Sequence, residues 1–279
     1  MTRGDESSEV RDAPLRMDTT RASVPRVYDA LLGGKDNFQV DRDVRARFLE
    51  LDPEFLRAVL DRRDFMMRVT RYLAGELGIS QFLDLGATLP EAENTHEVAQ
   101  RLNRESAMVY VSLDRGVLAH GRALVADNDR THMVEADFRK PRQVIEHPTV
   151  AKHLDFSQPM AVYHVGTMQH VRPERDPAGI VADYIDALAP GSYFVFAHLI
   201  DPVEDEELSK LANAVRDVYV NAQVPLWLRT REEIEGMLAG LELLDPGLVL
   251  LADWWPDGPR LQPLGRTQRL ALGAVGRKP

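Results

Sequence analysis

The feature that most constrains the fold is a short apolar run that ends in an acid, a leucine and a glycine. Residues 81–85 read Gln-Phe-Leu-Asp-Leu, and Gly86 follows them. After a loop, residues 94–100 have the apolar spacing of a helix. A strand, a glycine-containing loop and a helix in this order are typical of the first unit of a nucleotide-binding α/β sheet. We therefore expect a ligand at the carboxyl end of this strand.

Further apolar runs follow at intervals that leave room for helices. Together with the first run they predict five strands, at residues 81–85, 108–112, 132–136, 160–165 and 193–198. Alternation of this kind predicts an α/β fold with a mostly parallel sheet and helices on both of its faces. The turn at Pro190-Gly191 leads into the fifth strand.

The segments on either side of these strands also carry clear signals. Residues 24–75 predict helices, with Asp41 as the cap of a helix that runs to Leu51 and Pro53 in the first turn of the next one. The later patterns predict helices near 204–220 and 230–238, with a Thr230–Glu233 capping box, and a closing hairpin from 241–251 and 268–275.

Length and composition limit the classes of protein. The 279 residues suit one large α/β domain with additions, and we divide them into a disordered tail (1–22), a helical cap (23–76) and a Rossmann-like domain (77–279). The absence of cysteine excludes disulfides and thiolate chemistry, and a net charge of -10 argues against a general nucleic-acid binder. No apolar run suits a membrane span or a signal peptide, so we expect a cytoplasmic chain without a membrane partner.

Motifs along almost the whole chain point to one family. The most specific block is Leu-Leu-Gly-Gly-Lys-Asp-Asn-Phe at residues 31–38, and the other matching segments are 26–29, 81–84, 94–100, 109–111 with Asp114, 136–137, 190–193 and 231–234. On these residues the chain resembles the actinobacterial S-adenosylmethionine-dependent methyltransferases once filed as a domain of unknown function.

The resemblance implies a fold, a cofactor and an activity. It implies a class I methyltransferase sheet in the order 3-2-1-4-5-7-6, with an N-terminal helical cap over S-adenosylmethionine. It also implies methyl transfer, but it does not supply the substrate. Our own hypothesis is that the acceptor is a small molecule, with a place in secondary metabolism. The oligomeric state stays open.

The same resemblance implies cofactor contacts at the first two strand ends, and two of them are altered. Asp84 and Gly86 match the loop that contacts the amino-acid part of the cofactor, but Thr88 adds a side chain where the family usually has glycine. Ser112 replaces an acid that accepts hydrogen bonds from the ribose, a loss of roughly 1.5–3 kcal/mol for a charged acceptor. Asp114 either reaches in instead or only caps the next helix.

Further candidate site residues lie at the end of the third strand and in the helical cap. Asp137 matches the acid that binds the adenine amino group, with Phe138 beside the ring, or else it is an ordinary helix cap. The segment Lys35-Asp36-Asn37 is implied at the pocket mouth, or else it is only a turn between helices. Arg62 stands where the family usually has asparagine and either changes the polarity of the pocket or lies on a solvated helix face.

The fourth strand supplies candidates for acid–base chemistry. His164 and His170 can act as general bases because a free imidazole titrates near neutrality, and Tyr163 can donate a hydrogen bond. Successive strand side chains alternate, so Tyr163 and His164 cannot both face a ligand. The alternative for each histidine is a satisfied core group. No histidine spacing suggests a metal site.

Three functions therefore compete. The first is a methyltransferase that acts on a small molecule. Because Thr88 and Ser112 change together, the second is a methyltransferase fold that has lost methyl transfer and catalyses a cofactor-independent cyclisation or isomerisation. The third is a binding or regulatory protein without turnover.

Overall fold

The five apolar runs form the parallel centre of the sheet. The computed structural model describes residues 18–89 and 93–279. In it the strands are β1 (Gln81–Asp84), β2 (Ala107–Ser112), β3 (Thr131–Glu135), β4 (Ala161–Val165) and β5 (Tyr193–Leu199). Each begins and ends within one residue of its predicted bounds. All residues of β4 are buried, as is typical of a parallel strand covered on both faces.

The sheet closes with antiparallel strands from the end of the chain. Strand β8 (Ala271–Arg277) pairs with β5, and β6 (Glu242–Leu243) and β7 (Val249–Leu250) both pair with β8. The order β3-β2-β1-β4-β5-β8-β6 follows the predicted path, with the predicted sixth strand divided into β6 and β7. Pro246 lies in the interruption, and proline cannot donate to a ladder. The predicted start of the last strand at residue 268 is wrong, because residues 267–270 form a 3-10 turn, η5 (Thr267–Leu270).

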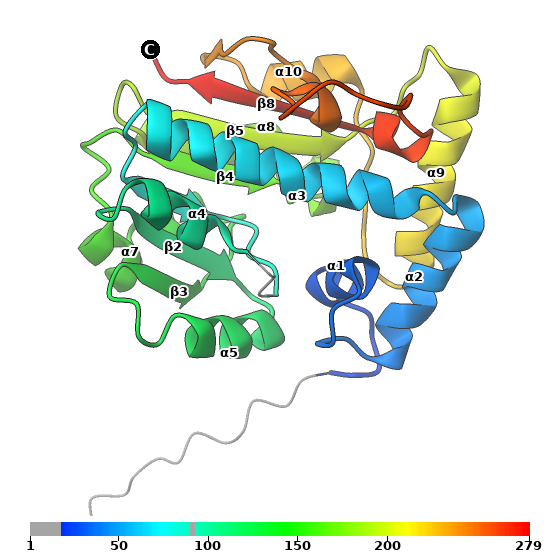
Figure 1. Cartoon of the computed structure of the whole chain (residues 1–279), viewed down its shortest axis with the longest axis horizontal. Helices are drawn as coiled ribbons and strands as arrows, with labels where there is room; N and C mark the ends of the chain where they lie inside the picture. The colour runs from blue at the N-terminus through cyan, green and yellow to red at the C-terminus, as the bar shows by residue number, and fades with distance from the viewer. Residues whose placement is uncertain (1–17, 90–92) are drawn as a thin grey trace, which may run out of the picture.

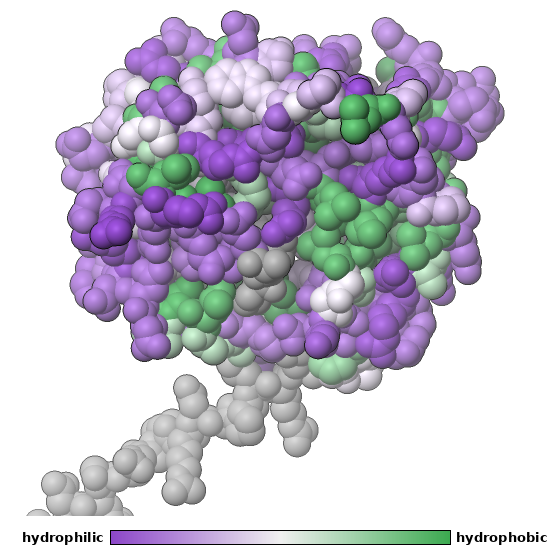
Figure 2. Space-filling model, viewed as in Figure 1, coloured by the Kyte–Doolittle hydropathy of each residue, from purple (hydrophilic) through white to green (hydrophobic). Residues whose placement is uncertain are grey.

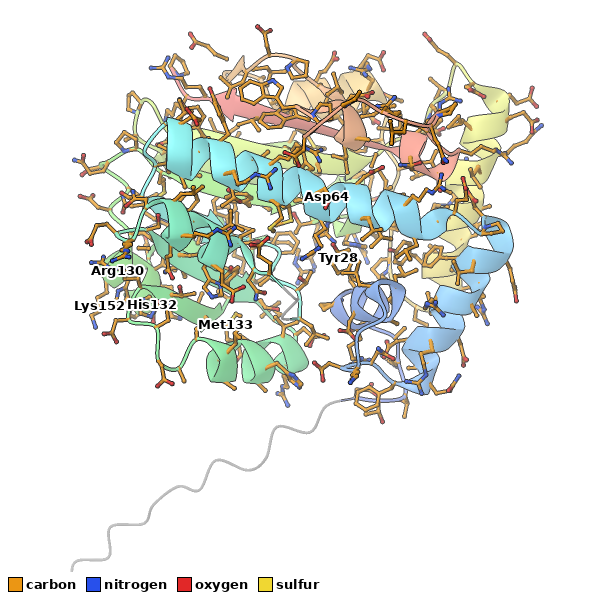
Figure 3. The ribbon with its side chains drawn as sticks, viewed as in Figure 1. Tyr28, Asp64, Arg130, His132, Met133 and Lys152 are labelled. Carbon is orange, nitrogen blue, oxygen red and sulfur yellow. The ribbon has the colours of Figure 1, made fainter. Side chains whose placement is uncertain are left out.

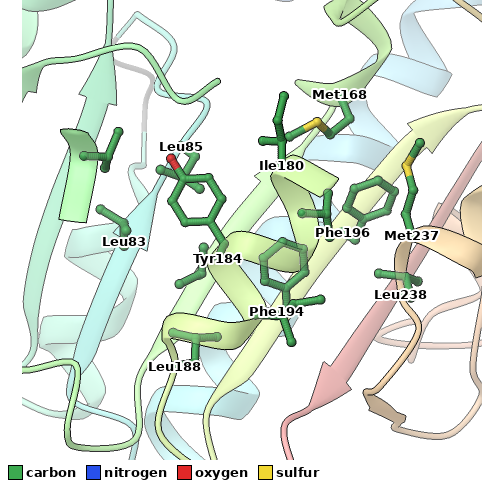
Figure 4. Packing of buried hydrophobic residues seen from close by; sticks show 14 of the residues in the cluster. Leu83, Leu85, Met168, Ile180, Tyr184, Leu188, Phe194, Phe196, Met237 and Leu238 are labelled. Carbon is green, nitrogen blue, oxygen red and sulfur yellow. The ribbon is translucent and has the colours of Figure 1, made fainter. Parts of the chain in front are cut away.

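Helices cover both faces of the sheet (Figure 1). The connecting helices are α4 (Thr95–Leu102), α5 (Arg115–Leu124), α6 (Pro141–Ile145), α7 (Pro148–His153), α8 (Pro177–Ala187) and α10 (Arg231–Met237), with 3-10 turns at Met168–His170, Pro173–Arg175 and Leu251–Asp253. On one face Tyr184, Phe194 and Phe196 pack with leucines of the strands (Figure 4). On the other face Phe65, Val69 and Leu73 pack against Phe82 and Tyr163.

The N-terminal helices form a third apolar cluster with a helix that comes late in the chain. They are α1 (Val24–Leu32), α2 (Gln39–Leu51) and α3 (Phe55–Arg71), which continues into a π-helical turn at Tyr72–Glu76. Side chains of all three pack with α9 (Glu206–Asn221). The cap thus has its own core, while α3 also covers the sheet. The predicted tail lies mostly outside the described residues, and the predicted boundary at residue 76 stays a prediction.

Three local predictions can be checked at helix ends. The capping box at Thr230 is confirmed, since Thr230 N–H donates to Glu233 at 2.8 Å. Asp41 is not the cap of α2, because that helix begins three residues earlier with Phe38 at its N-cap. Asp41 instead accepts the Phe38 N–H at 2.9 Å and forms a fully buried ion pair with Arg26 at 2.9 Å. Pro53 precedes α3 rather than lying in its first turn.

No helix in the described part of the chain is long and apolar enough to cross a membrane.

Candidate active site

The carboxyl end of β1 places a buried acid at a loop. Asp84 is 4% exposed, and its carboxylate accepts the Gly86 N–H at 2.9 Å. Burial raises the pKa of Asp84 from 3.8 to about 6, against the lowering effects of that hydrogen bond and of the Arg62 charge. Among the described residues, no cation lies within ion-pair distance of it. A buried carboxyl without a counter-ion suits a cationic ligand.

Gly86 is needed by the packing of its loop against the end of β4. A Cβ at this position would lie 2.5 Å from Cγ2 of Thr167. Real Cβ atoms do not approach other atoms so closely, so any larger residue would displace the loop or Thr167. The glycine thus brings the Asp84 loop against the neighbouring strand end, which is the arrangement expected at a ligand-binding edge of a parallel sheet.

Asp84, Gly86 and Thr88 line one cavity, as does Arg62. We call it the Asp84 cavity; it encloses about 610 Å³, including the space at its mouth. Its other walls come from α1, α3, α4, α5, β2 and β3: Tyr28, Arg63, Met66, Met67, Glu93, Asn94, Thr95, His96, Tyr110, Gly121, Leu124, Val125 and Met133. Three of the predicted cofactor residues therefore lie together.

Tyr110 organises one wall of this cavity, and the sequence reasoning did not single it out. Its hydroxyl accepts the backbone N–H of His96 at 3.0 Å, and it lies 3.0 Å from Nδ1 of His96 and 2.7 Å from the Thr95 hydroxyl. Burial raises the pKa of Tyr110 and lowers that of His96. Both rings are therefore neutral structural groups that fix the start of α4 against β2.

A second, mainly apolar cavity lies beside the first. We call it the Tyr219 cavity; it encloses about 780 Å³ on the same measure. It is lined by Val24, Tyr28, Leu31, Phe55, Ala58, Val59, Arg62, Gly166, Gln169, Ala197, His198, Leu199, Val215, Tyr219, Leu251, Thr267, Leu270 and Ala271. Tyr28 and Arg62 line both cavities, and Figure 3 shows Tyr28 between α1 and α3. These two side chains form the wall that the cavities share.

Arg62 forms a hydrogen bond and an aromatic contact but no ion pair among the described residues. Its Nη2 donates to the Val165 carbonyl at 3.0 Å, and its guanidinium lies 4.6 Å from the centre of the Tyr28 ring. Its Nε is buried without a hydrogen-bond partner. Within residues 18–89 and 93–279, no carboxylate lies within 4.0 Å of the guanidinium. Arg62 thus lines both cavities instead of lying on a fully solvated helix face, and its effect on a ligand stays a prediction.

At the end of β2, Asp114 caps a helix. Its carboxylate accepts the N–H groups of Gly116 at 2.8 Å and Val117 at 3.1 Å at the start of α5. The Asp114 N–H in turn donates to the Ser112 hydroxyl at 3.1 Å. The strand ends at Ser112, so the capping alternative for Asp114 is confirmed. Whether either residue also contacts a ribose stays a prediction.

The acid after β3 is already paired. Both oxygens of Asp137 accept hydrogen bonds from the Arg139 guanidinium, at 2.7 and 2.9 Å. Burial alone raises the pKa of Asp137, but the bonds and charge of Arg139 make the net change a lowering. The neighbouring Phe138 ring packs edge-on against His164 at 5.6 Å. An adenine contact at Asp137 must therefore share the carboxylate with Arg139, and it stays a prediction.

The most specific sequence block, residues 31–38, forms a loop that folds around the Asp29 carboxylate. Gly33 has φ +78°, and a Cβ at Gly34 would overlap the Asp29 carboxylate. That carboxylate accepts the Asp36 N–H at 3.0 Å and the Asn37 side-chain amide at 2.7 Å. Lys35, Asp36 and Asn37 line a separate cavity with Arg26, Phe38, Leu89, Gly116 and His120. The block thus positions the cap loop opposite the start of α5.

Tyr163 and His164 face opposite sides of β4, as the alternation predicts. The Tyr163 hydroxyl lies 3.0 Å from the Thr70 hydroxyl, and burial raises the pKa of Tyr163. His164 is fully buried and its Nδ1 bonds to Thr167. Burial lowers the pKa of His164 to about 3. Neither side chain belongs to the lining of the two cavities, and Nε2 of His164 is buried without a hydrogen-bond partner. Both side chains lie in the core, and a catalytic role for either stays a prediction.

Two more histidines lie near the Tyr219 cavity. His170 donates from Nδ1 to the Pro225 carbonyl at 2.7 Å, its Nε2 is buried without a partner, and burial lowers its pKa to about 4. Its ring lies 6.1 Å from that of Tyr219. His198 lines the cavity, but Arg229 donates to its Nε2 at 2.7 Å and Nδ1 donates to the Leu199 carbonyl at 2.6 Å. His198 is therefore a fixed neutral group.

Groups of three or more metal-ligating side chains do not occur among the described residues.

Comparisons with known proteins agree on one family. Residues 10–279 match the model of a family described as S-adenosyl methyltransferase. A candidate methyltransferase from Thermobifida fusca YX is 40% identical, with a TM-score of 0.88 over 94% of this chain and 96% of that one. A DUF574 family protein from Streptomyces avermitilis MA-4680 is 34% identical, with a TM-score of 0.88 over 95% of this chain and 100% of that one. No curated protein matches. With the sheet order and the Asp84 loop, these matches identify the chain as a member of the S-adenosyl methyltransferase family.

Proposed function

We propose that this family member methylates an oxygen or nitrogen atom of a small, largely apolar molecule. The observation that carries the proposal is the pair of adjoining cavities. One contains the buried acid and glycine loop at the end of β1, and the other is walled by apolar side chains of the cap, α9 and the end of β5. Tyr28 and Arg62 line both cavities, so the two candidate ligand sites adjoin at these side chains.

The residues of the Asp84 cavity fit S-adenosylmethionine. Its amino-acid part carries an ammonium, and Asp84 is a buried carboxyl without a counter-ion among the described residues. Gly86 brings the loop backbone close to the strand end, and Thr88 narrows the same cavity. When bound, the cofactor supplies a methyl group on a positively charged sulfur, from which an acceptor lone pair displaces it in line.

The protein acts chiefly by holding the acceptor and excluding water. The Tyr219 cavity is bordered mainly by apolar and aromatic side chains, which suit a largely apolar acceptor. Figure 2 shows apolar surface gathered in the region that α1 occupies in Figure 1. Fixing two reactants in the right geometry removes a large part of the barrier.

General-base catalysis by β4 has no support from the positions of its side chains. His164 and Tyr163 are enclosed in the core, and His198 has both ring nitrogens occupied. Nε2 is buried without a hydrogen-bond partner in both His164 and His170, and a role as base stays a proposal for His170, whose ring lies 6.1 Å from that of Tyr219.

Calorimetric titration with S-adenosylmethionine and S-adenosylhomocysteine tests the cofactor assignment. We expect saturable binding to the wild-type chain and at least tenfold weaker binding to Asp84→Asn, because a charge-assisted contact is lost. Asp217→Asn is the matched control, since Asp217 lies exposed on α9. Binding that is unchanged in Asp84→Asn would contradict the assigned role of this acid.

The same titration separates the rival functions. A chain that binds neither compound has lost methyl transfer, which leaves cofactor-independent cyclisation or isomerisation, or a binding role without turnover. The cytoplasmic location, the place in secondary metabolism and the lack of a nucleic-acid partner stay predictions from the sequence.

A further inference from the structure

Arg62 is a part-buried cation that has no carboxylate within 4.0 Å among the described residues. One of its donors bonds to the Val165 carbonyl, its face lies over Tyr28, and its Nε is buried without a partner. Removing a charge from water is costly unless an opposite charge or several hydrogen bonds replace the water. A guanidinium with spare donors in a cavity wall therefore points to an anionic ligand atom.

Arg62 acts on the groups around both cavities. Its charge lowers the pKa of Asp84, of His170 and of Tyr219. Burial has the larger effect on each group: it raises the pKa of Asp84 and Tyr219 and lowers that of His170. His170 and Tyr219 belong to the acceptor side, where no carboxylate lines the cavity. The acceptor side therefore has a positive field and nothing in its lining to neutralise it.

The rest of the Tyr219 cavity fits an aromatic body. Tyr28, Phe55 and Tyr219 contribute aromatic rings to the lining, and leucine and valine side chains line the wall between these rings. Aromatic rings favour stacked or edge-on contacts with other rings. Among its polar groups, the His198 ring is already hydrogen-bonded, Gln169 accepts the Leu199 N–H at 3.1 Å, and Thr267 donates to Asp52 at 3.0 Å. The tyrosine hydroxyls and the Arg62 guanidinium complete the polar lining.

We propose that the acceptor is an aromatic compound with an acidic hydroxyl, and that Arg62 binds the oxygen of that hydroxyl in its ionised form. This inference rests on the proposed function, since it names the class of acceptor. The hydroxyl proton leaves to solvent on binding, and the oxygen keeps the electron pair that attacks the methyl group. Arg62 is then a binding residue that raises the nucleophile concentration, and the chain needs no histidine to remove the proton.

The test uses 4-nitrophenol as a probe, because its anion absorbs visible light and its neutral form does not. The absorbance of the probe is titrated with wild-type protein at several pH values, without cofactor. We expect the bound probe to ionise at a lower pH than the free probe, with the anion bound about tenfold or more tightly than neutral nitrobenzene, as for a charge-assisted hydrogen bond.

Three variants locate the effect. Arg62→Gln is expected to abolish the preference for the anion, while Arg62→Lys keeps part of it because the charge remains. Arg57→Gln is the control, since Arg57 lies on the same helix and pairs with Glu54 at the surface. A preference that survives in Arg62→Gln, or is lost equally in Arg57→Gln, would overturn the proposal.

The wild-type chain alone also decides the question if Arg62→Gln fails to fold. Equal affinity for nitrobenzene and 4-nitrophenolate, or no affinity for either, would overturn the proposal. Calorimetry with S-adenosylmethionine on the same proteins keeps the two claims apart. If Arg62→Gln weakens only cofactor binding, Arg62 serves the cofactor carboxylate and the acceptor assignment fails, while the methyltransferase function stands.

Discussion

Replacing Asp84 by asparagine should stabilise the ligand-free protein at neutral pH. Burial raises the pKa of Asp84 from 3.8 to about 6. At about 1.4 kcal/mol for each tenfold change in an ionisation equilibrium, ionising this carboxyl costs the folded state about 3 kcal/mol. Asparagine cannot ionise, yet its side-chain oxygen can still accept the Gly86 N–H. We therefore expect the variant to be about 3 kcal/mol more stable at pH 7.5.

The sign of the pH dependence makes the prediction specific. The folded state holds the Asp84 proton more tightly than the unfolded chain, so this group favours folding less as the pH rises from about 4 to 6. At pH 4 the unfolded chain is still partly ionised, so the advantage of asparagine should fall to about 0.6 kcal/mol, and it should vanish below about pH 3 where both states are protonated. Urea denaturation of both proteins at pH 4 and 7.5 measures the difference, and groups other than Asp84 cancel in the comparison.

Two results would refute this reasoning. One is an Asp84→Asn variant that is less stable than wild type at pH 7.5. The other is a stability difference that stays the same at both pH values, which would mean that the asparagine acts through packing and not through the lost ionisation. We expect higher stability together with weaker cofactor binding, because residues at functional sites are often less stabilising than the alternatives that function excludes.

Four further substitutions test the packing of the Asp84 loop, a buried ion pair of the cap and the role of His164. Gly86→Ala should cost about 1–3 kcal/mol by overpacking and weaken cofactor binding, and Thr167→Ser, which removes the clashing methyl group, should recover part of both in urea denaturation and calorimetry. Asp41→Ala should cost about 3–5 kcal/mol in the same denaturation assay, because it leaves Arg26 buried without its partner; a loss below 1 kcal/mol would contradict this. His164→Phe should keep the turnover number within several-fold of wild type once an acceptor is known, whereas a thousandfold loss would restore His164 as a base.

The sheet was predictable because its signals are local. Apolar runs of five or six residues between helical stretches predict buried parallel strands, and each was found within one residue. The divided sixth strand was not predicted, because an apolar stretch does not show where the chain leaves the ladder. Asp114 illustrates a local feature that could be weighed in advance, since a cap bonds only to residues two and three positions later.

The walls of the site were harder to predict because distant segments build them. Alternation places Tyr163 and His164 on opposite faces of β4, but it cannot tell which face a helix will cover. In the structure α8 covers one and α3 the other, so both side chains are buried. Arg62 has the spacing of a surface residue on α3, and only its place between the two cavities removes it from solvent.

Asp84 and Arg62 together explain why a site can keep two costly charges. The Arg62 charge lowers the pKa of the Asp84 carboxyl, yet the two side chains do not form an ion pair within 4.0 Å, and neither has another ionic partner among residues 18–89 and 93–279. Had they paired, each would be satisfied without a ligand. Because they stay apart, the carboxylate remains available to a cation on one side and the guanidinium to an anion on the other. Under the function proposed above, the energetic cost of these two charges is offset when both ligands are bound, which is the state in which methyl transfer would take place.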